Sequence, residues 1–365
     1  MRKVRVAIIG TRGYPSYYGG FETAVRKIVE SEHSNSLDFV VFSRETDCVR
    51  DPLQKNVRVV YSRFIKTKYL STLSHIFLSM NALRKVKPDV VLGFNVSCGY
   101  VAPILRIMGI PLILNVDGLE WKRGKWGRIG KLVFFCGAWL SAKFADILVA
   151  DSTNIASYWR LNFRRECCFI PYGGEEVVSK SGLNNERPYI LYVARFVPEN
   201  HVLEFLEAIQ WIDSSVDICV VGKSHSAEYA AEQLEGLVIR DSRVKDLGRI
   251  INEDDLNQYW ANSLVYFHGH SVGGTNPALV QAMASGCNIV AFDSVFNREV
   301  LGDSALFTRS APKAIAQEIN NLISNSKLRK QLSESAILRA KEMYTWDQIV
   351  KQYSALIEDS RRGRL

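Results

Sequence analysis

Short apolar runs recur along the whole chain, and each is followed by a polar or glycine-containing turn. Runs of this length and composition are typical of buried strands, and the segments between them have helical periodicity. The predicted strands are Val4–Ile9, Phe39–Ser43, Val57–Tyr61, Val90–Phe94, Leu112–Val116, Asp146–Ala150, Cys168–Pro171, Tyr189–Ala194, Val216–Gly222, Val244–Leu247, Leu264–Phe267 and Ile289–Phe292. Because strands alternate with helices, the pattern predicts parallel βαβ units and an α/β fold.

The length of 365 residues allows two domains with full cores. A turn at Pro171–Glu175 is the expected linker, and an amphipathic helix is expected from Thr345 to Glu358. There is no apolar run of about 18 residues, so no membrane-spanning helix is expected. A strand that begins at residue 4 leaves no room for a signal peptide, which favours a cytoplasmic location.

The cysteine and histidine patterns give no support for a disulfide framework or a metal site. None of the seven cysteines forms a CxxC pair, and the six histidines show no HExxH spacing. We expect reduced core thiols, no metal and no resident cofactor.

Positive charge is concentrated in the first half of the chain. Residues 1–172 contain 26 Lys and Arg against 13 Asp and Glu, a net +13, whereas the remainder contains 20 against 25, a net −5. A basic half favours an anionic partner. No nucleic-acid motif is present, so an anionic membrane surface and a lipid-linked pyrophosphate are expected before nucleic acid.

The turn after the first predicted strand is rich in glycine but is not a dinucleotide fingerprint. Residues 10–20 read GTRGYPSYYGG, without GxGxxG, which argues against NAD or FAD. Gly19 and Gly20 would let this loop approach a ligand, with Glu22 close behind. A flexible loop without a ligand is the alternative.

The stretch LVYFHGHSVGGTNPALVQAMASG, residues 264–286, reads as strand, glycine loop and helix. Asn276 is the expected N-cap, Pro277 suits the first turn and Gly286 suits the C-terminal cap. Gly273 and Gly274 would allow a diphosphate to approach the backbone at the helix N-terminus. An ordinary tight β–α turn is the alternative.

This stretch resembles the donor-binding segment of family 4 retaining glycosyltransferases of the GT-B type. The chain is most similar to the rhamnosyltransferase subgroup with a DUF1972-type N-terminal domain. The resemblance extends through IGTRGYPSYYGGFET, DGLEWKRGKWG and VARFVPEN, and therefore covers nearly the whole chain in order.

The resemblance implies two Rossmann-like domains that face each other across a cleft. Residues 1–172 would form the acceptor-side domain, 173–344 the nucleotide-sugar domain, and 345–365 a helix that crosses back to the first domain. It implies a metal-independent hexosyltransferase that moves rhamnose from dTDP-rhamnose to a polyprenyl-diphosphate-linked saccharide. The enzyme would work in cell-surface polysaccharide synthesis at the inner face of the plasma membrane.

By the same resemblance, several residues receive roles in binding the donor. Gly19 and Gly20 would line the donor diphosphate, and Gly222 and Arg249 would border the base. The residues expected to bind the diphosphate, sugar and ribose are Arg195, Asn200, Gly273, Gly274, Thr275, Asn276 and Gln281.

Three positions depart from the usual family pattern. Asp117 stands where the family has histidine, and a carboxylate there could act as general base on the acceptor hydroxyl or be a simple loop acid. Asn200 replaces lysine, and its amide can still donate a hydrogen bond. Gln281 replaces glutamate, which costs the charge-assisted part of a ribose contact, roughly 1–2 kcal/mol.

Tryptophans alternate with cations over Trp121–Lys131, before an apolar run. This pattern is typical of a segment at a lipid interface, and a charged loop leading into a core helix is the alternative. The residues predicted to contact membrane or acceptor are Trp121, Lys122, Arg123, Lys125 and Trp126.

Two other functions remain open. A nucleotide-sugar 2-epimerase has the same fold and needs no acceptor, but it does not explain the basic–aromatic segment. A non-catalytic protein that binds nucleotide or glycan would explain the changes at Asp117 and Gln281.

Overall fold

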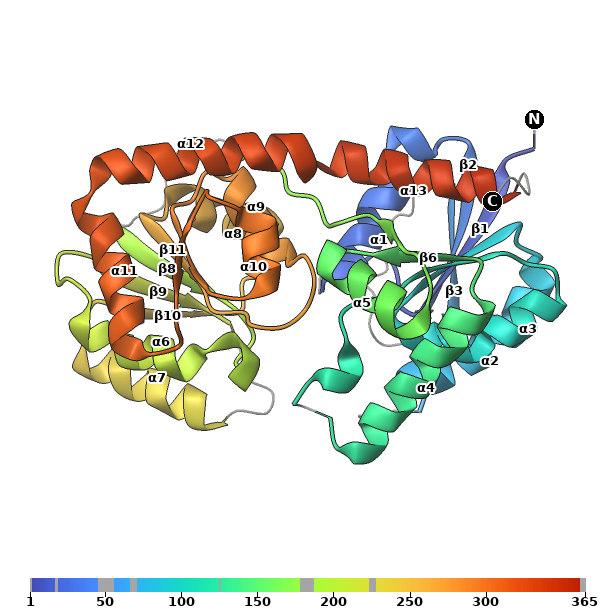
Figure 1. Cartoon of the computed structure of the whole chain (residues 1–365), viewed down its shortest axis with the longest axis horizontal. Helices are drawn as coiled ribbons and strands as arrows, with labels where there is room; N and C mark the ends of the chain where they lie inside the picture. Colours follow the sequence, from blue (N-terminus) through green and yellow to red (C-terminus); the bar gives the residue numbers. More distant parts are fainter. Residues whose placement is uncertain are drawn as a thin grey trace. The chain divides into compact units, whose positions relative to one another are not determined.

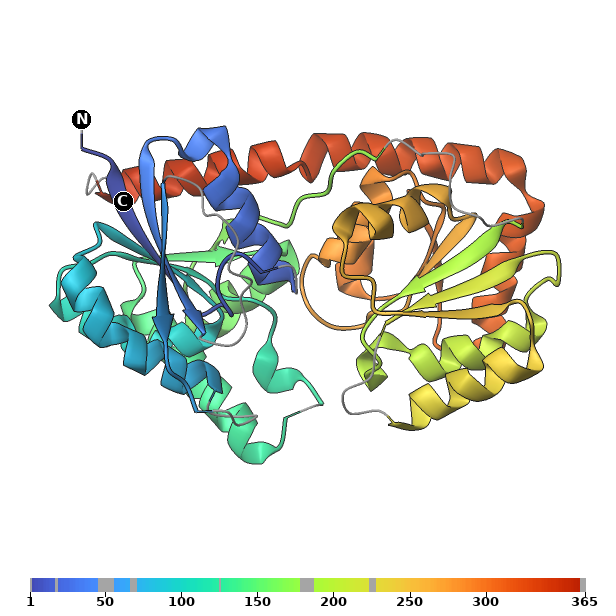
Figure 2. The same ribbon diagram turned by 180° about the vertical axis from the view of Figure 1, so that it is seen from behind.

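The structure is a computed structural model that describes residues 2–16, 19–44, 56–65, 71–124, 126–177, 187–222 and 228–361. The chain forms two units (Figure 1). The first contains Met1–Tyr172 and Trp346–Leu365, and the second contains Gly173–Thr345. Within each unit, helices cover both faces of a parallel sheet (Figures 1 and 2).

The sheet of the first unit has the strand order β3-β2-β1-β4-β5-β6-β7 in the described residues. Its strands are β1 (Val4–Ile9), β2 (Leu37–Arg44), β3 (Val57–Ser62), β4 (Val90–Phe94), β5 (Leu112–Asn115), β6 (Ile147–Ala150) and β7 (Cys168–Phe169). Ile8 pairs in register with Val41 on one side and Leu92 on the other. The order reverses between β1 and β4, and ligands of such sheets bind where this reversal occurs.

The helical segments of the first unit are α1 (Gly20–Glu30), η1 (Glu32–Ser34), α2 (Ser71–Val86), η2 (Val96–Val101), α3 (Ala102–Ile107), η3 (Glu120–Lys122), α4 (Arg128–Phe144), α5 (Thr153–Phe163) and α13 (Trp346–Arg361). The C-terminal helix α13 contributes Tyr353 and Ile357 to the same core as Val25 and Ile28 of α1. The last helix of the chain is thus built into the hydrophobic core of the first unit.

The sheet of the second unit has the order β10-β9-β8-β11-β12-β13 in the described residues. Its strands are β8 (Tyr189–Val193), β9 (Asp217–Val221), β10 (Val244–Gly248), β11 (Val265–His268), β12 (Ile289–Phe292) and β13 (Leu306–Thr308). The helical segments are η4 (Pro198–Asn200), α6 (Val202–Ala208), η5 (Ile209–Trp211), α7 (Glu228–Arg240), α8 (Glu253–Asn262), α9 (Pro277–Ala284), α10 (Val295–Leu301), α11 (Pro312–Ser324) and α12 (Ser326–Met343). Here the strand order reverses between β8 and β11.

The predicted α/β fold with two doubly wound parallel sheets is confirmed, with small differences. The sequence prediction missed β13, because Leu306–Thr308 is too short for a recognisable pattern. The helix α6 ends at Ala208 and continues as a 3₁₀ turn to Trp211. The segment from Asn297 to Glu299 lies within α10.

Of the six cysteines in the described residues, three are core thiols as expected, two are exposed, and Cys167 is partly buried. Cys98, Cys219 and Cys287 are buried, whereas Cys136 and Cys168 are exposed. Among the described residues, no helix combines the length and apolar character needed to cross a bilayer.

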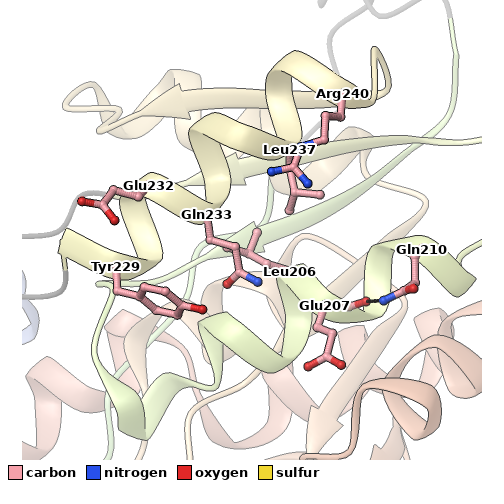
Figure 3. A pocket seen from close by; sticks show the side chains of 8 residues that line it. All are labelled: Leu206, Glu207, Gln210, Tyr229, Glu232, Gln233, Leu237 and Arg240. Atoms are coloured by element: carbon pink, nitrogen blue, oxygen red, sulfur yellow. Dashed lines mark hydrogen bonds between the residues drawn. The ribbon is translucent and has the colours of Figure 1, made fainter.

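A groove of about 440 Å³ lies between α6 and α7 of the second unit (Figure 3). Its lining is Leu206, Glu207, Gln210, Tyr229, Glu232, Gln233, Leu237 and Arg240. None of the predicted donor-binding residues is in this lining, so the groove is separate from the predicted site.

Candidate functional site

The loops after β8 and β11 meet at the point where the strand order of the second unit reverses. The backbone N–H and the hydroxyl of Ser271 both donate to the carbonyl oxygen of Glu199, each at 2.9 Å. A Cβ on Gly269 would lie 2.2 Å from the carbonyl oxygen of Asn200, so only glycine permits this approach. The fold therefore brings two stretches predicted to bind the donor, about 70 residues apart in the chain, to one edge of the sheet.

The predicted start of α9 is confirmed in detail. Asn276 is the N-cap, its side-chain oxygen accepts from the N–H of Ala278 at 2.9 Å, and Pro277 is the first helical residue. Gly273 has φ +114°, a conformation that glycine adopts readily, and Gly274 follows it in the loop. Thr275 is buried, so its side chain lies inside the loop rather than on the surface predicted to bind the donor.

Arg195 is an exposed cation at this edge of the sheet. Its side chain is exposed, while its carbonyl oxygen accepts from the N–H of Val197 at 2.9 Å and from the amide of Asn200 at 2.8 Å. Backbone anchoring with an exposed guanidinium is the arrangement expected of an anion-binding arginine. Asn200 itself is buried, so the prediction that its amide contacts the diphosphate is replaced by a role in holding Arg195 in place.

Asn297 holds the β11 loop from the neighbouring helix α10. Its amide donates to the carbonyl oxygens of His270 and Phe292, both at 2.8 Å. Sequence reasoning gave this residue no role, because its partners are main-chain groups that no residue pattern identifies.

Gln281 is engaged within the second unit in a way that was not predicted. Its side-chain oxygen accepts from the N–H of Glu175 at 3.0 Å, and its amide donates to the carbonyl of Glu175 at 2.9 Å. The amide also lies 3.2 Å from the hydroxyl of Ser285. Both ends of the side chain therefore fasten residue 175 to α9, instead of being directed only toward a ribose.

The two residues predicted to border the base lie at the carboxyl ends of β9 and β10. A Cβ on Gly222 would lie 2.1 Å from the carbonyl oxygen of Ala194, and its N–H donates to Gly248 at 2.8 Å. Gly222 is therefore required by packing, whether or not a base lies there. Arg249 is exposed, immediately after Gly248, which has φ +59°.

In the first unit, Asp117 is the centre of a hydrogen-bond network at the carboxyl ends of β4 and β5. Its oxygens accept from the amide of Asn95 at 3.0 Å and from the N–H of Gly118 at 2.7 Å. Asn115 accepts from the N–H of Asp117 at 3.0 Å and donates to the hydroxyl of Tyr353 at 2.9 Å. Asp117 and Asn95 both have positive φ, +61° and +76°, and such strained backbone is concentrated at functional sites.

The electrostatics at Asp117 differ from those of an ordinary loop acid. Burial raises the pKa of Asp117, and the nearby Glu120 raises it further, against the opposing effects of Arg123 and the hydrogen bonds to Gly118 and Asn95. Burial also raises the pKa of Tyr172 well above its usual range, with Asp151 and Asp117 adding to the shift. A carboxylate with a raised pKa is a stronger base, which agrees with the predicted role.

The loop before α1 is organised by Glu22. Its carboxylate accepts from the N–H of Arg12 at 2.9 Å, and burial raises its pKa. Gly19 has φ +118°, and a Cβ there would lie 2.4 Å from a carboxylate oxygen of Glu22. Gly19 and Gly20 thus let the chain enter α1 past a buried carboxylate, and Glu22 positions the loop.

The basic–aromatic segment is not the exposed interface that its sequence predicts. Trp121 is 9% exposed, and its ring contacts those of Phe135, Tyr158, Trp159 and Phe163 at centroid distances of 6.0 to 6.4 Å. The prediction for Trp121 is therefore wrong, because an aromatic cluster from α4 and α5 encloses the ring.

The residues next to Trp121 in the sequence also have contacts within the first unit. The buried Glu120 accepts from the guanidinium of Arg123 and from the indole N–H of Trp126, both at 2.8 Å. The ammonium of Lys122 lies 4.2 Å from the ring centroid of Tyr158. Lys125, also predicted to contact membrane or acceptor, is outside the described residues.

The two doubly wound units have the fold of the GT-B glycosyltransferases. Residues 174–339 match the family model of glycosyl transferases group 1. Residues 2–85 and 90–175 match a domain of unknown function, DUF1972. The chain therefore combines a DUF1972 domain with a group 1 glycosyltransferase domain in one GT-B fold.

Individual relatives agree with this assignment. An uncharacterized glycosyltransferase of Methanocaldococcus jannaschii is 25% identical over 247 residues, which are 63% of this chain and 60% of that relative. The sucrose-phosphate synthase of Thermosynechococcus elongatus has a similar structure, with a TM-score of 0.83, 19% identity and coverage of 99% of this chain and 100% of that one. Anabaena HepE, solved with UDP, gives a TM-score of 0.77 at 16% identity, over 98% and 100% of the two chains.

Proposed function

We propose that this protein is a retaining glycosyltransferase that moves a hexose from a nucleotide diphosphate to a lipid-diphosphate-linked saccharide. The observation that carries the proposal is the meeting of the β8 and β11 loops in the second unit. The β8 loop carries the exposed Arg195, and the β11 loop leads into the capped start of α9. Backbone N–H groups of a glycine loop that precedes a helix, together with an arginine guanidinium, are groups that stabilise a diphosphate leaving group.

In this proposal the second unit binds the donor. Arg195 and the backbone of Gly273 and Gly274 neutralise the charge that develops on the diphosphate as the sugar–oxygen bond breaks. They do this without a metal ion, so transfer is expected to proceed in the presence of a chelator. Gly222 and Arg249 border the base.

The first unit supplies the general base for proton transfer and presents the acceptor. The nucleoside diphosphate leaves the anomeric carbon, and the acceptor oxygen forms the new glycosidic bond on the face from which the diphosphate left, so the configuration is retained. Asp117 accepts the proton of the acceptor hydroxyl. The raised pKa of Asp117 favours this proton transfer. Asn95 orients the carboxylate through its amide, and Asn115 holds the backbone of Asp117 by accepting from its N–H.

The donor proposed is dTDP-rhamnose, on the resemblance of GGTNP and its flanking residues to the rhamnosyltransferase subgroup. A related HepE structure contains UDP-glucose, so UDP-sugars are the main competitors to test. The acceptor proposed is a polyprenyl-diphosphate saccharide of cell-surface polysaccharide synthesis, used at the inner face of the plasma membrane. The net +13 of residues 1–172 supports an anionic membrane partner for the first unit.

The test is turnover followed by mass spectrometry. Purified protein is offered dTDP-rhamnose and a panel of UDP- and GDP-sugars with a short lipid-diphosphate-GlcNAc acceptor and EDTA. A mass gain of one deoxyhexose from dTDP-rhamnose is expected. Gain only from another donor would overturn the sugar assignment, and gain only after divalent metal is added would overturn metal independence.

A second candidate is a non-catalytic protein that binds nucleotide or glycan. The engagement of Gln281 with Glu175 favours it, because this side chain already has protein partners at both ends. Folded protein that binds dTDP but transfers from no donor would support this candidate over the transferase.

A further inference from the structure

The helix α4 of the first unit has its large apolar residues on the outside. Its buried positions hold small residues, namely Gly130, Gly137, Ala138 and Ser141. Its exposed positions include Ile129 (80% exposed), Leu132 (61%), Phe135 (44%) and Trp139 (50%). A surface helix of a globular protein normally buries its large apolar side chains, so α4 is the reverse of the usual arrangement.

The small residues are required by the packing of α4 against η2. A Cβ on Gly137 would lie 2.7 Å from the carbonyl oxygen of Val96, and one on Gly99 would lie 2.1 Å from the carbonyl oxygen of Gly137. The hydroxyl of Tyr100 also donates to the carbonyl oxygen of Val133 at 2.9 Å. This close contact fixes the rotation of α4 and holds its other side toward solvent.

The outward residues form one continuous stripe. Ile129, Leu132, Cys136 and Trp139 follow the spacing i, i+3, i+7 and i+10, which places them on one side of a helix. The neighbouring helix α3 ends with Arg106 and with Ile107, which is 87% exposed. Figure 1 shows α4 at an edge of the first unit, beside α3. We call Ile129, Leu132, Phe135, Cys136 and Trp139 the α4 stripe.

The charged residues within α4 are all cations, and the exposed Asp146 follows the helix. Residues 121–145 contain six Lys and Arg and no Asp or Glu. Arg128 and Lys143 are exposed at the two ends of α4, and the ammonium of Lys143 lies 5.1 Å from the ring centroid of Trp139. Apolar and aromatic residues that alternate with cations along a helix are complementary to an anionic lipid surface, where the rings enter the interface and the cations meet headgroups.

We propose that the α4 stripe is the surface by which the first unit binds an anionic bilayer. The helix has 17 residues and three cations, so it lies in the plane of the interface and does not cross it. This inference rests on the proposed function at a membrane. It replaces Trp121 as the predicted membrane contact with the α4 stripe, because the Trp121 side chain is buried and the side chains of the α4 stripe are exposed.

The test is co-sedimentation of the full chain with vesicles of phosphatidylcholine mixed with phosphatidylglycerol, and with vesicles of phosphatidylcholine alone. The test variant carries Ile129→Ser and Leu132→Ser. The matched control carries Ile239→Ser and Leu338→Ser in the second unit, where the native side chains are 85% and 59% exposed. A third variant carries Arg128→Glu and Lys143→Glu. Thermal melting shows whether each variant is folded.

We expect the native chain and the control to bind the mixed vesicles equally, with much weaker binding to phosphatidylcholine alone. The test variant and the charge variant should each lower the partition coefficient by roughly tenfold or more, because each removes two of the contacts that hold such a helix at the interface. Equal loss in the control, or equal binding to both kinds of vesicle, would overturn the proposal. So would a change from dimer to monomer in the test variant without any change in vesicle binding, because the occupant would then be a second copy of the chain.

A transfer assay with a water-soluble acceptor separates this inference from the proposed function. The test variant should transfer at the native rate, since its substitutions lie outside the residues assigned to chemistry. Vesicle binding without transfer from any donor would leave the α4 stripe standing and reject the transferase. Transfer without vesicle binding would support the transferase and reject the α4 stripe as a membrane-binding surface.

Discussion

The substitution Gln281→Glu separates two accounts of this residue. By resemblance to the family, glutamate at this position would strengthen a ribose contact. The structure predicts damage instead, because the amide of Gln281 donates to the carbonyl of Glu175 at 2.9 Å and a carboxylate has no hydrogen to donate. One oxygen of the new side chain would still accept from the N–H of Glu175.

The size of the effect follows from these contacts. Losing one hydrogen bond costs about 1 kcal/mol, and turning a carboxylate oxygen toward a carbonyl oxygen adds a similar amount at a half-buried site. We therefore expect the second unit to lose about 1–2 kcal/mol of unfolding free energy. For a unit of this size, the melting temperature should fall by about 2–8 °C.

The assay combines thermal melting with calorimetric titration of dTDP. The matched control is Gln210→Glu, because the amide of Gln210 also donates to a backbone carbonyl, that of Glu207 at 3.0 Å, but at an exposed position of the groove in Figure 3. Its expected effect is within about 0.5 kcal/mol. A Gln281→Glu variant that is as stable as the native chain and binds dTDP more tightly would refute the proposed bonds between Gln281 and Glu175 as the main role of this side chain. It would restore the predicted contact with the ribose.

Three further predictions concern the loops and the core. In the native protein, the acidic limb of the pH dependence of kcat/KM should have its midpoint above the ordinary pKa range of aspartate, because burial raises the pKa of Asp117. Asp117→Asn should abolish this limb. The folded state binds the proton of Asp117 more tightly than the unfolded state does, so the native free energy of unfolding should fall as the pH rises through the raised pKa. Urea titrations at several pH values should show this fall in the native protein and not in Asp117→Asn. Gly269→Ala should cost about 1–3 kcal/mol and weaken dTDP binding, measured by melting and calorimetry, because its Cβ would meet the carbonyl oxygen of Asn200 at 2.2 Å. Trp121→Ala should cost about 3–5 kcal/mol in urea unfolding, against less than about 1 kcal/mol for the half-exposed Trp139→Ala.

Local patterns predicted the parts of this molecule that local forces determine. The β11 loop and α9 show this most clearly, because the N-cap at Asn276, the first-turn Pro277 and the left-handed Gly286 depend on neighbouring residues only. The alternation of apolar runs with helices was sufficient for the fold class.

The features that sequence reasoning missed depend on contacts between distant parts of the chain. Trp121 sits among rings from α4 and α5, and a run of tryptophans and cations does not reveal which ring turns inward. Asn200 and Gln281 bond to main-chain carbonyls, which every residue carries and no motif marks. The same limit hid the outward face of α4, because the small residues that fix its rotation are recognisable only once η2 lies against them.

The central claim is that the second unit binds the donor and the first supplies the base, and one paired measurement tests it. The affinity for dTDP and the transfer rate are measured for the native chain, Arg195→Ala and Asp117→Asn. The account predicts that Arg195→Ala loses both, with roughly tenfold or more weaker dTDP binding from the lost charge-assisted contacts. It predicts that Asp117→Asn binds dTDP as the native chain does but transfers at least about a hundredfold more slowly. Native dTDP affinity in Arg195→Ala, or native transfer in Asp117→Asn, would contradict it.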